Sequence, residues 1–600
     1  MPSRRTALGL LIGACALGAR PSASQPADGA PKAFGYEDVV RQARALGERP
    51  FDPGGASIPP ELSKLTYDSY REIRFRRDKA LWRDGESDFR LLPFHLGFLH
   101  DKPVQLYVIS RGAAVPVPFT TGLFEYGKVP VPKGLSPSLG FAGFAVTTNL
   151  NDPKVQDEVI SFLGASYFRV LGRGHRYGLS ARSLALDVGG EKPEEFPFMR
   201  ALWVEEPSRD TTELVIYALL DSPSVAGAYR YVVSPGRETR VEITATIVPR
   251  RVIERIGIAP LTSMFQAGEG DLAQRSDFRP EVHDSDGLML HSGHGEWIWR
   301  PIRNPKTLRI SSFGDRNPRG FGLMQRDRAF SSYQDLEAQY HRRPSYWIEP
   351  HGDWGEGRVD LIEIPTDTEA FDNIVACWTP KEPLPIAQPA EFRYRLSAMS
   401  ATWDLHPYAQ AQQSFNGSDV EDERADGRGR KRFIVDFAGG DLAYYQHDPD
   451  RLELVATTTA ARRCPRHRRR HPARRPVCGT AHVHQVARTH PERNLDGDLV
   501  GPARRWCPRA AIAKLVRRSR ADTVQHLAWR GIRDSGCPDG GPGRRPAPVR
   551  GWRREWPAAA SSGRSARPSV HADIRADRLD APASTAGRRE ASYSRAPRTR

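Results

Sequence analysis

Cysteine is scarce in this chain of 600 residues, which contains six in all. Cys377 is alone in the main part of the chain, and the others are Cys15, Cys464, Cys478, Cys507 and Cys537. This scarcity excludes a disulfide framework and a Cys-rich zinc site for the main part. Long hydrophobic runs are missing as well. No stretch of about eighteen apolar residues occurs, which excludes a multi-pass membrane protein.

An excess of basic charge is also missing from most of the chain. The whole chain carries 88 Lys and Arg against 72 Asp and Glu, a net charge of +16. Residues 461–600 contribute 33 basic and 11 acidic residues, which leaves residues 1–460 with 55 basic and 61 acidic residues. A mildly acidic body lacks the electrostatic footprint of nucleic-acid binding. We therefore expect no nucleic-acid partner.

The N-terminus has the pattern of an export signal. Arg4 and Arg5 precede a short apolar run that ends at Leu17, and Ser22-Ala-Ser24 offers a small-residue cleavage site. The paired arginines resemble a twin-arginine (Tat) signal, which carries folded proteins across a bacterial inner membrane. We expect residues 1–24 to be this signal, a periplasmic location, and no membrane-spanning segment after cleavage. Cleavage before Cys15, as in a lipoprotein, is the alternative.

Strand patterns dominate the body. Residues 36–48 have weak helical spacing, but residues 241–248 then alternate apolar and polar side chains as a half-buried strand does. Further strands are expected at residues 214–220, 229–233, 358–364 and 374–378. Turn residues recur between them, which indicates a mainly β protein with an antiparallel sandwich over residues 34–385.

A Pro-rich connector at residues 379–389 separates this sandwich from a second β segment. Strands are expected there at residues 391–396 and 433–437, which suits a small sandwich over residues 390–457.

The composition changes near residue 458. Residues 461–600 hold 32 Arg but one Lys, Lys514, and no Phe, although the chain has 24 Phe. A high-GC gene read in a shifted frame yields such a mixture of Arg, Pro, Ala and Gly. We interpret residues 458–600 as the product of a frameshift. The alternative is a native, disordered basic tail that binds polyanions.

Many long motifs occur in one order along the body. They include Leu139-Gly-Phe-Ala-Gly-Phe144, Leu163-Gly-Ala-Ser-Tyr-Phe-Arg169, Tyr177-Gly-Leu-Ser-Ala-Arg182, Ala259-Pro-Leu-Thr-Ser-Met-Phe265, Gly295-Glu-Trp-Ile-Trp-Arg-Pro301 and Asp372-Asn-Ile-Val375. With these motifs the chain resembles the periplasmic glucan biosynthesis proteins G and D (OpgG/OpgD, also MdoG/MdoD). The resemblance runs from about Tyr36 to Leu442 and fades by about Thr457. The leader and Val282-His-Asp-Ser-Asp-Gly287 look more like the D member.

The resemblance implies a fold and a role. The fold is a large galactose-mutarotase-like β-sandwich followed by an immunoglobulin-like β-sandwich, which would be truncated here. The role is in the synthesis of osmoregulated periplasmic glucans, with linear β-1,2-glucan chains as the ligand and a membrane glucan synthase as a further partner.

The resemblance also implies catalytic residues. Glycosidic cleavage needs two carboxyl groups, one that protonates the leaving oxygen and one that activates water. Asp372 matches the general acid of the family's inverting β-1,2-glucanases, Asp284 matches the general base, and Tyr340 matches a position near their long proton relay. Glu369 precedes Asp372 by three residues, and its charge would raise the pKa of Asp372, as Asp286 would for Asp284. The pair Ala370-Phe371 departs from the smaller or more polar residues expected before this aspartate.

Binding a neutral, hydroxylated polymer needs aromatic faces and polar groups. Our candidates for substrate binding are the residues that cluster around tryptophans or near Asp372: Trp297, Trp299, Arg300, Trp347, Trp354 and Glu369. Alternation places Trp297 and Trp299 on one face if residues 297–299 form a strand. The alternative is that these tryptophans fill the core of the sandwich.

No cofactor is expected. His291 and His294 have metal-ligand spacing but no evident third ligand, and Gly268-Glu-Gly270 lacks a phosphate-loop pattern. Two functions are consistent with the sequence. The first is an exported endo-β-1,2-glucanase, a glycoside hydrolase that trims the glucan backbone. The second is a non-catalytic factor that binds nascent glucan and guides it from the synthase to the branching steps.

Overall fold

The computed structural model describes residues 33–54, 58–269, 271, 277–400, 405, 409–418, 431–445, 452–458, 479–486, 498–500, 504–506 and 511–517. The export signal expected at residues 1–24 and most of the tail expected from residue 458 lie outside these ranges.

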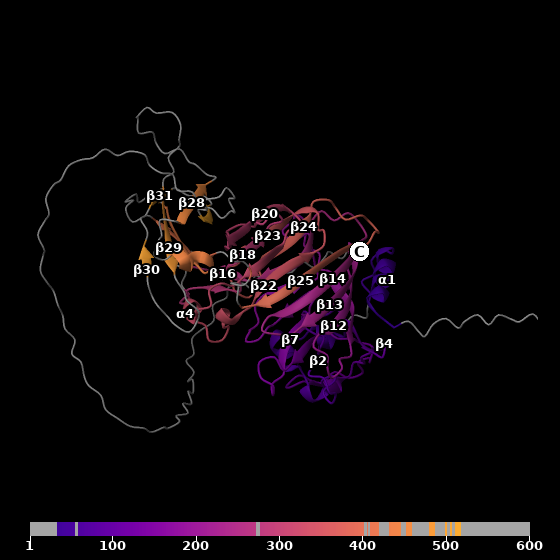
Figure 1. Ribbon diagram of the computed structural model, residues 1–600. Helices are drawn as coiled ribbons and strands as arrows, with labels where there is room; N and C mark the ends of the chain where they lie inside the picture. The colour runs from indigo at the N-terminus through magenta and orange to yellow at the C-terminus, as the bar shows by residue number, and fades with distance from the viewer. Residues whose placement is uncertain are drawn as a thin grey trace, which may run out of the picture. The chain divides into compact units, whose positions relative to one another are not determined.

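Two large sheets form a β-sandwich (Figure 1), which confirms the predicted fold class. The first has ten strands, ordered β2 (Arg90–Phe94), β6 (Gly143–Thr148), β7 (Asp157–Leu163), β8 (Tyr167–Val170), β9 (Ser180–Arg182), β15 (Ile256–Ser263), β24 (Ile374–Pro380), β23 (Glu356–Glu363) and β20 (Arg309–Arg316), with β10 (Leu184–Leu186) also on β15.

The second sheet has eleven strands. Their order is β19 (Trp297–Pro301), β18 (Gly287–His291), β21 (Gly320–Met324), β22 (Ser345–His351), β25 (Ala390–Met399), β14 (Thr239–Pro249), β13 (Val225–Ser234), β12 (Leu214–Asp221), β11 (Phe198–Glu205), β3 (Gln105–Ser110) and β4 (Ala113–Pro116). All these pairings are antiparallel except that of β11 with β3.

Short elements complete the sandwich. The helices are α1 (Tyr36–Gly47), α2 (Pro60–Ser63), α3 (Tyr67–Glu72) and α4 (Phe330–Tyr333). The single 3-10 turns are η1 (Arg77–Lys79), η2 (Thr121–Leu123) and η4 (Tyr340–Arg342), and the two small ladders are β1 (Arg74–Phe75) with β5 (Phe124–Glu125) and β16 (Phe265–Ala267) with β17 (Val282–His283).

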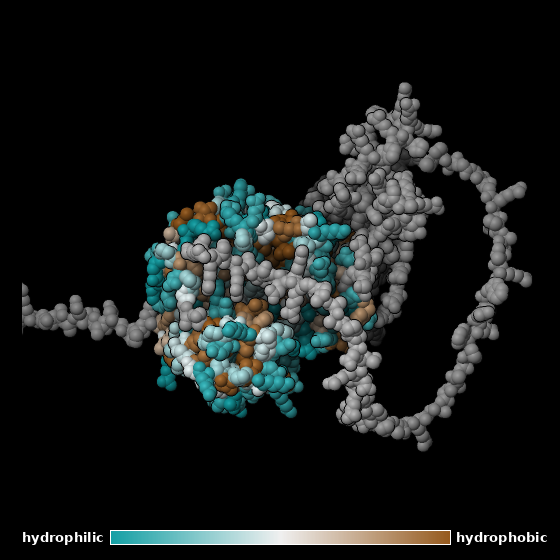
Figure 2. Space-filling model, turned by 180° about the vertical axis from the view of Figure 1, so that it is seen from behind, coloured by the Kyte–Doolittle hydropathy of each residue, from teal (hydrophilic) through white to brown (hydrophobic). Residues whose placement is uncertain are grey.

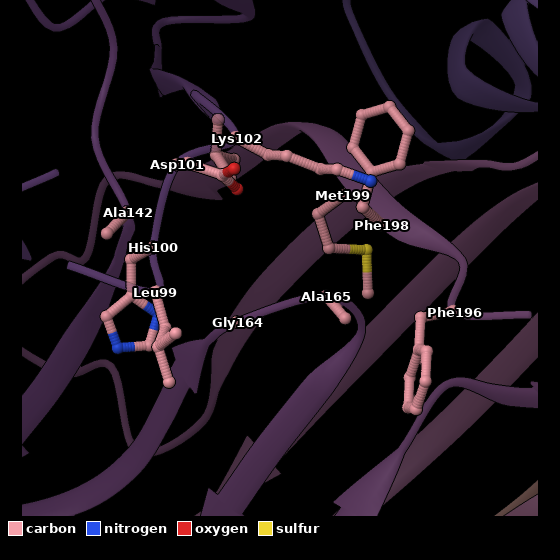
Figure 3. A pocket seen from close by; sticks show the side chains of 11 residues that line it. Leu99, His100, Asp101, Lys102, Ala142, Gly164, Ala165, Phe196, Phe198 and Met199 are labelled. Atoms are coloured by element: carbon pink, nitrogen blue, oxygen red, sulfur yellow. The ribbon is translucent and has the colours of Figure 1, made fainter. Parts of the chain in front are cut away.

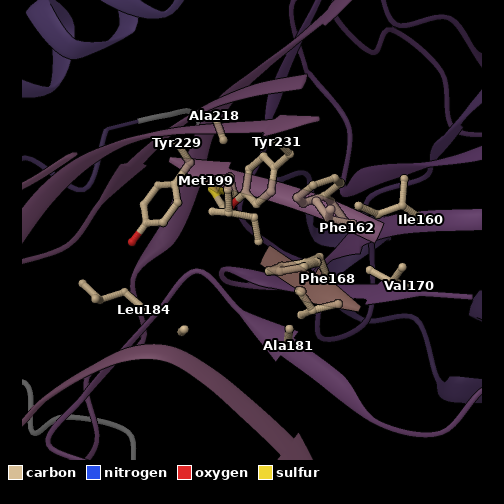
Figure 4. Close-up of a cluster of buried hydrophobic side chains, with 14 of the residues drawn as sticks. Ile160, Phe162, Phe168, Val170, Ala181, Leu184, Met199, Ala218, Tyr229 and Tyr231 are labelled. Carbon is tan, nitrogen blue, oxygen red and sulfur yellow. The ribbon is translucent and has the colours of Figure 1, made fainter. Parts of the chain in front are cut away.

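Aromatic side chains from both sheets meet in the core (Figure 4). Tyr231 on β13 makes edge-to-face contacts with Phe162 and Phe168 of the other sheet, at centroid distances of 5.1 and 5.4 Å. Its hydroxyl lies 2.7 Å from the Ser183 hydroxyl, so its polar end is also satisfied. The period of two that the sequence showed at residues 241–248 turns Val241, Ile243 and Ala245 inward along β14.

Helix α1 confirms the helix predicted at residues 36–48 and packs on the outer face of the larger sheet (Figure 1). Its buried stripe of Val39, Val40 and Ala43 contacts Trp203 and Tyr217 there. On the face of the molecule in Figure 2, hydrophilic residues cover most of the coloured surface and hydrophobic residues gather in separate patches.

The boundary between the two β segments lies later than the Pro-rich connector predicts. Strand β25 (Ala390–Met399) follows that connector, yet it pairs with β14 and β22 in the middle of the larger sheet. Its residues Tyr394 and Leu396 are buried in the core of the sandwich. The first sandwich therefore extends to residue 399.

Beyond residue 399, β26 (Gln410–Ser418) pairs with β27 (Lys431–Ala438), and a 3-10 segment, η5 (Gly440–Tyr445), follows. Strands also occur within the Arg-rich tail. They are β29 (Gly479–Val486), β30 (Asp498–Val500), β31 (Arg504–Trp506) and β32 (Ala511–Arg517), and β32 pairs with β28 (Leu452–Thr458), which ends where the tail begins. Parts of the tail therefore have secondary structure, and its origin in a frameshift stays a prediction.

A buried charged cluster lies beside β17. His283 is fully buried, with Nε2 2.7 Å from Glu281 and Nδ1 2.9 Å from the Gln325 side-chain oxygen. Burial lowers the pKa of His283, but Glu281 and the nearby Asp286 outweigh burial and raise that pKa to about 9. For Asp286, burial raises the pKa to about 6 although His283 and Arg326 oppose the shift. At a pH between the unfolded and the folded pKa of each group, His283 and Asp286 therefore keep a proton in the folded protein that they release in the unfolded chain.

Replacing Trp354 with alanine tests the core. Trp354 is 5% exposed and makes ring contacts with Trp378, Phe392 and Tyr394. We expect Trp354→Ala to lower the free energy of unfolding by about 3–5 kcal/mol, because the cavity cannot collapse between packed rings. Urea unfolding followed by circular dichroism measures this. The control Tyr67→Ala, at a ring that is 57% exposed, should lose about 1 kcal/mol or less. Equal losses would contradict the assignment of Trp354 to the core.

Replacing Asp286 with asparagine tests the buried cluster. An unfolded aspartate has a pKa of about 3.9, and the folded pKa of Asp286 is about 6. Its contribution to stability is complete below the unfolded pKa and is lost as pH rises through the folded pKa. We therefore expect the unfolding free energy of the wild type to fall relative to Asp286→Asn between about pH 4 and pH 6. Urea unfolding over this range measures the difference, with Asp210→Asn in an exposed turn as the control. A difference independent of pH would contradict the prediction.

Candidate functional site

Asp284 and Asp372 come from distant segments but are fastened to one short segment, Met264–Phe265. Asp284 follows β17, and its N–H donates to the carbonyl of Met264 at 2.8 Å. Asn373 follows Asp372 and is 2% exposed; its amide accepts from the Phe265 N–H at 2.8 Å and donates to the Phe265 carbonyl at 3.0 Å. The segment at the end of β15 therefore brings the two predicted catalytic carboxylates together.

The two carboxylates interact electrostatically. Asp284 is 3% exposed and accepts a hydrogen bond from the Arg343 guanidinium. Burial raises the pKa of Asp284 above its usual value, Arg343 opposes that shift, and the negative charge of Asp372 adds to it. The site therefore contains a buried aspartate with a positive partner and a second carboxylate within reach of its charge.

Asp372 has the more open position. It lies in the loop between β23 and β24, where it is exposed and accepts a hydrogen bond from the Ser180 hydroxyl at 3.4 Å. Ser180 begins β9, which pairs with β15 through Ser180 and Thr262. The neighbouring side chain, Phe371, is 54% exposed. A substrate can therefore reach Asp372 but not Asp284 directly.

Arg343 reaches Asp284 because Gly178 leaves room for it. A Cβ atom at residue 178 would lie 2.8 Å from the Cβ and 2.9 Å from the Cδ of Arg343, closer than van der Waals contact allows. The Arg343 guanidinium carbon also lies 4.0 Å from the centre of the Tyr340 ring, within range of a cation–π interaction. A side chain at residue 178 would displace the charge partner of Asp284.

Tyr340 and Glu369, both predicted at the site, contact each other. The Tyr340 hydroxyl donates to the Glu369 carboxylate. Burial of Tyr340, the hydrogen bond to Glu369 and the charge of Glu369 raise the pKa of the hydroxyl despite the opposing charge of Arg343, so the hydroxyl stays protonated. Glu369 also accepts from Arg279 at 2.9 Å. Its carboxylate is therefore engaged by Tyr340 and Arg279, and the expected effect of Glu369 on Asp372 stays a prediction.

Asp286 lies in a different electrostatic environment from Asp284. The charges that shift its pKa most are those of His283, Arg326, Glu281 and Asp327. Of these charges, only that of His283 is also among the main influences on the pKa of Asp284. Asp286 therefore belongs mainly to the buried cluster behind the site.

The tryptophans predicted to bind sugar pack against protein. Trp297 and Trp299 do lie on one face of β19, as alternation predicts, and they pack with Met289, Met324 and Trp347. Trp297 stacks on His291 at 4.0 Å and on Trp347 at 5.7 Å. These contacts favour the alternative in which the rings fill a core.

The remaining predicted binding residues have structural partners as well. Trp347 and Trp354 are 3% and 5% exposed, which leaves no ring face for a sugar. Arg300 donates to the fully buried Glu363 at 2.7 Å across to the other sheet. Their sugar-binding role is left out of the site that we propose below.

Sequence reasoning missed four residues that build this site: Gly178, Arg279, Arg343 and Asn373. Gly178 and Asn373 fall inside motifs that carry the family resemblance, which is the one signal that could have found them. Arg343 stands among the basic residues His341 and Arg342, and nothing in that run marks it as the partner of Asp284.

A cavity of about 160 Å³ lies elsewhere on the sandwich (Figure 3). Leu99 and His100 lie on one side of it, Phe196 on the other, and the turn at Gly164–Ala165 between them, while the Lys102 side chain extends to the Phe198 ring. None of the predicted site residues lines it.

Among the residues that the structure describes, no group of three or more His, Cys, Asp or Glu side chains is placed to hold a metal ion. Within the same ranges, none of the helices has both the length and the apolar character needed to cross a membrane.

The sequence is similar to curated proteins of glucan synthesis. It is 52% identical over 365 residues to "Glucans biosynthesis protein G" of Ralstonia nicotianae, and the matched residues make up 61% of this chain and 72% of that protein. It is 43% identical over 451 residues to "Probable glucans biosynthesis protein D" of Shewanella oneidensis, covering 75% and 82%. "Glucans biosynthesis protein G 1" of the same organism is 44% identical over 411 residues, covering 67% and 74%. Identity is higher to the first G protein and coverage is longer for the D protein, so closeness to the D member stays a prediction.

The family profile described as "Periplasmic glucan biosynthesis protein, MdoG" matches residues 34–490. This match includes both sheets of the sandwich, the candidate site and the second β segment, and it reaches beyond residue 457, where the motifs fade. The chain therefore belongs to the MdoG family of periplasmic glucan biosynthesis proteins.

Proposed function

We propose that this protein is a periplasmic endo-β-1,2-glucanase that cleaves linear glucan with inversion. The observation that supports this most is the pairing of an exposed carboxylate, Asp372, with a buried one, Asp284, whose pKa Asp372 influences. Glycosidases place two carboxyl groups around the bond that they cleave and give them different environments.

Asp372 suits the role of general acid. A general acid must touch the glycosidic oxygen, and Asp372 is the exposed member of the pair. A bound glucan would exclude water from its carboxyl group. Desolvation raises the pKa of a carboxyl and favours the protonated form that the acid needs.

Asp284 suits the role of general base acting through a relay. At 3% exposure it does not reach an anomeric carbon, so it does not suit direct nucleophilic attack and a retaining mechanism. Its hydrogen bond from Arg343 favours the carboxylate that a base requires. A proton would pass to it from the attacking water through intermediate hydroxyl groups. Tyr340 could be one of them, because it lies beside Arg343 and its hydroxyl is influenced by the charge of Asp284.

Exposed apolar side chains on the three loops that Arg279 joins suit the apolar faces of sugar rings. Phe278, Leu336 and Phe371 are 81%, 80% and 54% exposed. Each is one or two residues from a partner in the ion pairs of Arg279, which join their three loops. These side chains replace the buried tryptophans as the contacts that we propose for the glucan.

A role in assembly remains the competing function. In that role the protein would hold nascent β-1,2-glucan and pass it on from the membrane synthase, and neither carboxylate would matter. The family membership supports an association with glucans, and the two functions differ in whether the glucan is shortened.

The first test is Asp372→Asn. We expect hydrolysis of linear β-1,2-glucan to fall by about 10²–10⁴-fold, because the acid that protonates the leaving oxygen is lost. Product sizing by chromatography measures cleavage, and calorimetric titration with the same glucan should show binding within about threefold of wild type, since less than about 1 kcal/mol changes. Asp210→Asn is the matched control in an exposed turn. Unchanged hydrolysis in Asp372→Asn would remove this residue from the role, and a wild type that binds glucan without shortening it would establish the assembly factor.

The second test is Phe371→Ala. We expect KM for linear β-1,2-glucan to rise by about 3- to 10-fold with a smaller change in kcat, because a stacking contact worth about 1 kcal/mol is lost. Steady-state kinetics with chains of defined length measure both constants. Tyr67→Ala, which removes an aromatic ring that is 57% exposed on α3, should leave KM unchanged. An unchanged KM in Phe371→Ala would exclude this ring from the binding surface.

A further inference from the structure

Arg279 joins three loops at the edge of the candidate site. It donates to Asp277 in its own loop at 2.8 Å, to Asp335 before η4 at 2.8 Å, and to Glu369 in the loop between β23 and β24 at 2.9 Å. Its side chain is only 15% exposed, so the three bonds form largely out of water. Hydrogen bonding to Asp277 raises the pKa of Arg279 most; burial opposes the shift, and Glu369 and Asp335 add to it.

These bonds continue inward to Asp284. Glu369 accepts from the Tyr340 hydroxyl, the Tyr340 ring lies under the Arg343 guanidinium, and Arg343 donates to Asp284. Asp372 lies three residues after Glu369 in the same loop. The contacts from Arg279 to Asp284 therefore link the loop that carries one catalytic carboxylate to the residue that carries the other.

We propose that Arg279 is a positioning residue that holds the loop of residues 364–373 in place, so that Asp372 faces Asp284. This inference rests on the proposed function for its effect on catalysis. The hydrogen bonds from Arg279 to the three loops, which we call the clamp, do not depend on that function. Both ends of the loop are already held by hydrogen bonds. The Asn304 side chain bonds to the backbone of Thr366 at one end, and the Asn373 side chain bonds to the backbone of Phe265 at the other.

Between these ends, Gln266 donates to the Asp367 carbonyl at 3.0 Å, and Arg279 holds the loop closer to Asp372, at Glu369. Glu369 bonds to Arg279 and to Tyr340, and no other side chain holds that carboxylate among the described residues. Without Arg279, the carboxylates of Asp277, Asp335 and Glu369 would repel one another, and the loop would lose a bond near Asp372.

The geometry requires an arginine at this position. A guanidinium presents five N–H donors in a planar fork, and here the fork serves three carboxylates at once. A lysine would keep the positive charge but as a single point, without the fork. Charge alone would therefore restore only part of the effect.

The first measurement compares Arg279→Gln with Arg76→Gln. Arg76 forms an ion pair with Asp78 at 2.8 Å away from the site and serves as the matched control. We expect hydrogen–deuterium exchange of residues 364–373 to quicken in Arg279→Gln and to stay unchanged in Arg76→Gln, because the loop is released at Glu369. Equal exchange in wild type and Arg279→Gln would overturn the clamp, whatever the activity of the protein.

The second measurement is the hydrolysis of linear β-1,2-glucan. We expect kcat to fall by about 10- to 100-fold in Arg279→Gln, since a displacement of about 1 Å at a reacting group has this effect. The basic limb of the pH profile, where the general acid loses its proton, should move to higher pH, because an uncompensated Glu369 disfavours a second negative charge nearby. In Arg279→Gln/Glu369→Gln this pH shift should disappear, while Arg279→Lys should recover part of kcat. An unshifted profile in Arg279→Gln would overturn the link through Glu369.

The two measurements separate failure of the inference from failure of the proposed function. A wild type that does not cleave glucan refutes the glucanase, and exchange of residues 364–373 still decides the clamp. If Arg279→Gln does not fold, Glu369→Gln removes the same bond from the other side, and an unchanged exchange of the loop in that variant would overturn the inference.

Discussion

A carboxylate buried next to another carboxylate needs a positive partner, and Arg343 provides it for Asp284. Without this contact, burial and the charge of Asp372 would both act to neutralise Asp284. The contact in turn depends on the absence of a side chain at Gly178 and on the Tyr340 ring beneath the guanidinium. The polar interior of the site is therefore arranged around one ion pair.

The sandwich supplies the frame for that ion pair. Strand β15 lies in the middle of the ten-stranded sheet, and the segment that follows it, Met264–Phe265, binds both Asp284 and Asn373 through its backbone groups. Because these bonds use the main chain of that segment, they hold two distant parts of the sequence whatever its own side chains are. A rigid scaffold with functional loops at its edge is a common arrangement for binding and catalysis. In this protein the loop with Asp372 is the exposed part, and the segment with Asp284 is the buried part.

The sequence was sufficient for the β-sandwich, and the family resemblance singled out the two aspartates, whose catalytic roles stay predictions. Alternation at residues 241–248 and helical spacing at residues 36–48 depend on burial of one face, and both elements formed as predicted. Asp284 and Asp372 could be chosen from among many acids only through the family resemblance. The boundary at the Pro-rich connector failed because local turn residues do not tell which sheet the next strand joins, and β25 joined the larger one. Trp347 and Trp354 could not be assigned from sequence, because a tryptophan suits a core and a sugar equally well. Arg279 and Arg343 depend on contacts between remote loops, which no spacing in the chain reveals.

The stereochemistry of hydrolysis tests the central claim most directly, since it reports whether Asp284 attacks the sugar or activates water. Proton NMR of wild-type protein acting on linear β-1,2-glucan would identify the anomer that forms first. The account predicts the α-anomer, because water displaces a β-linked leaving group with inversion. Initial release of the β-anomer would contradict it, because a nucleophile would then have to touch the anomeric carbon from a position that the buried Asp284 does not occupy.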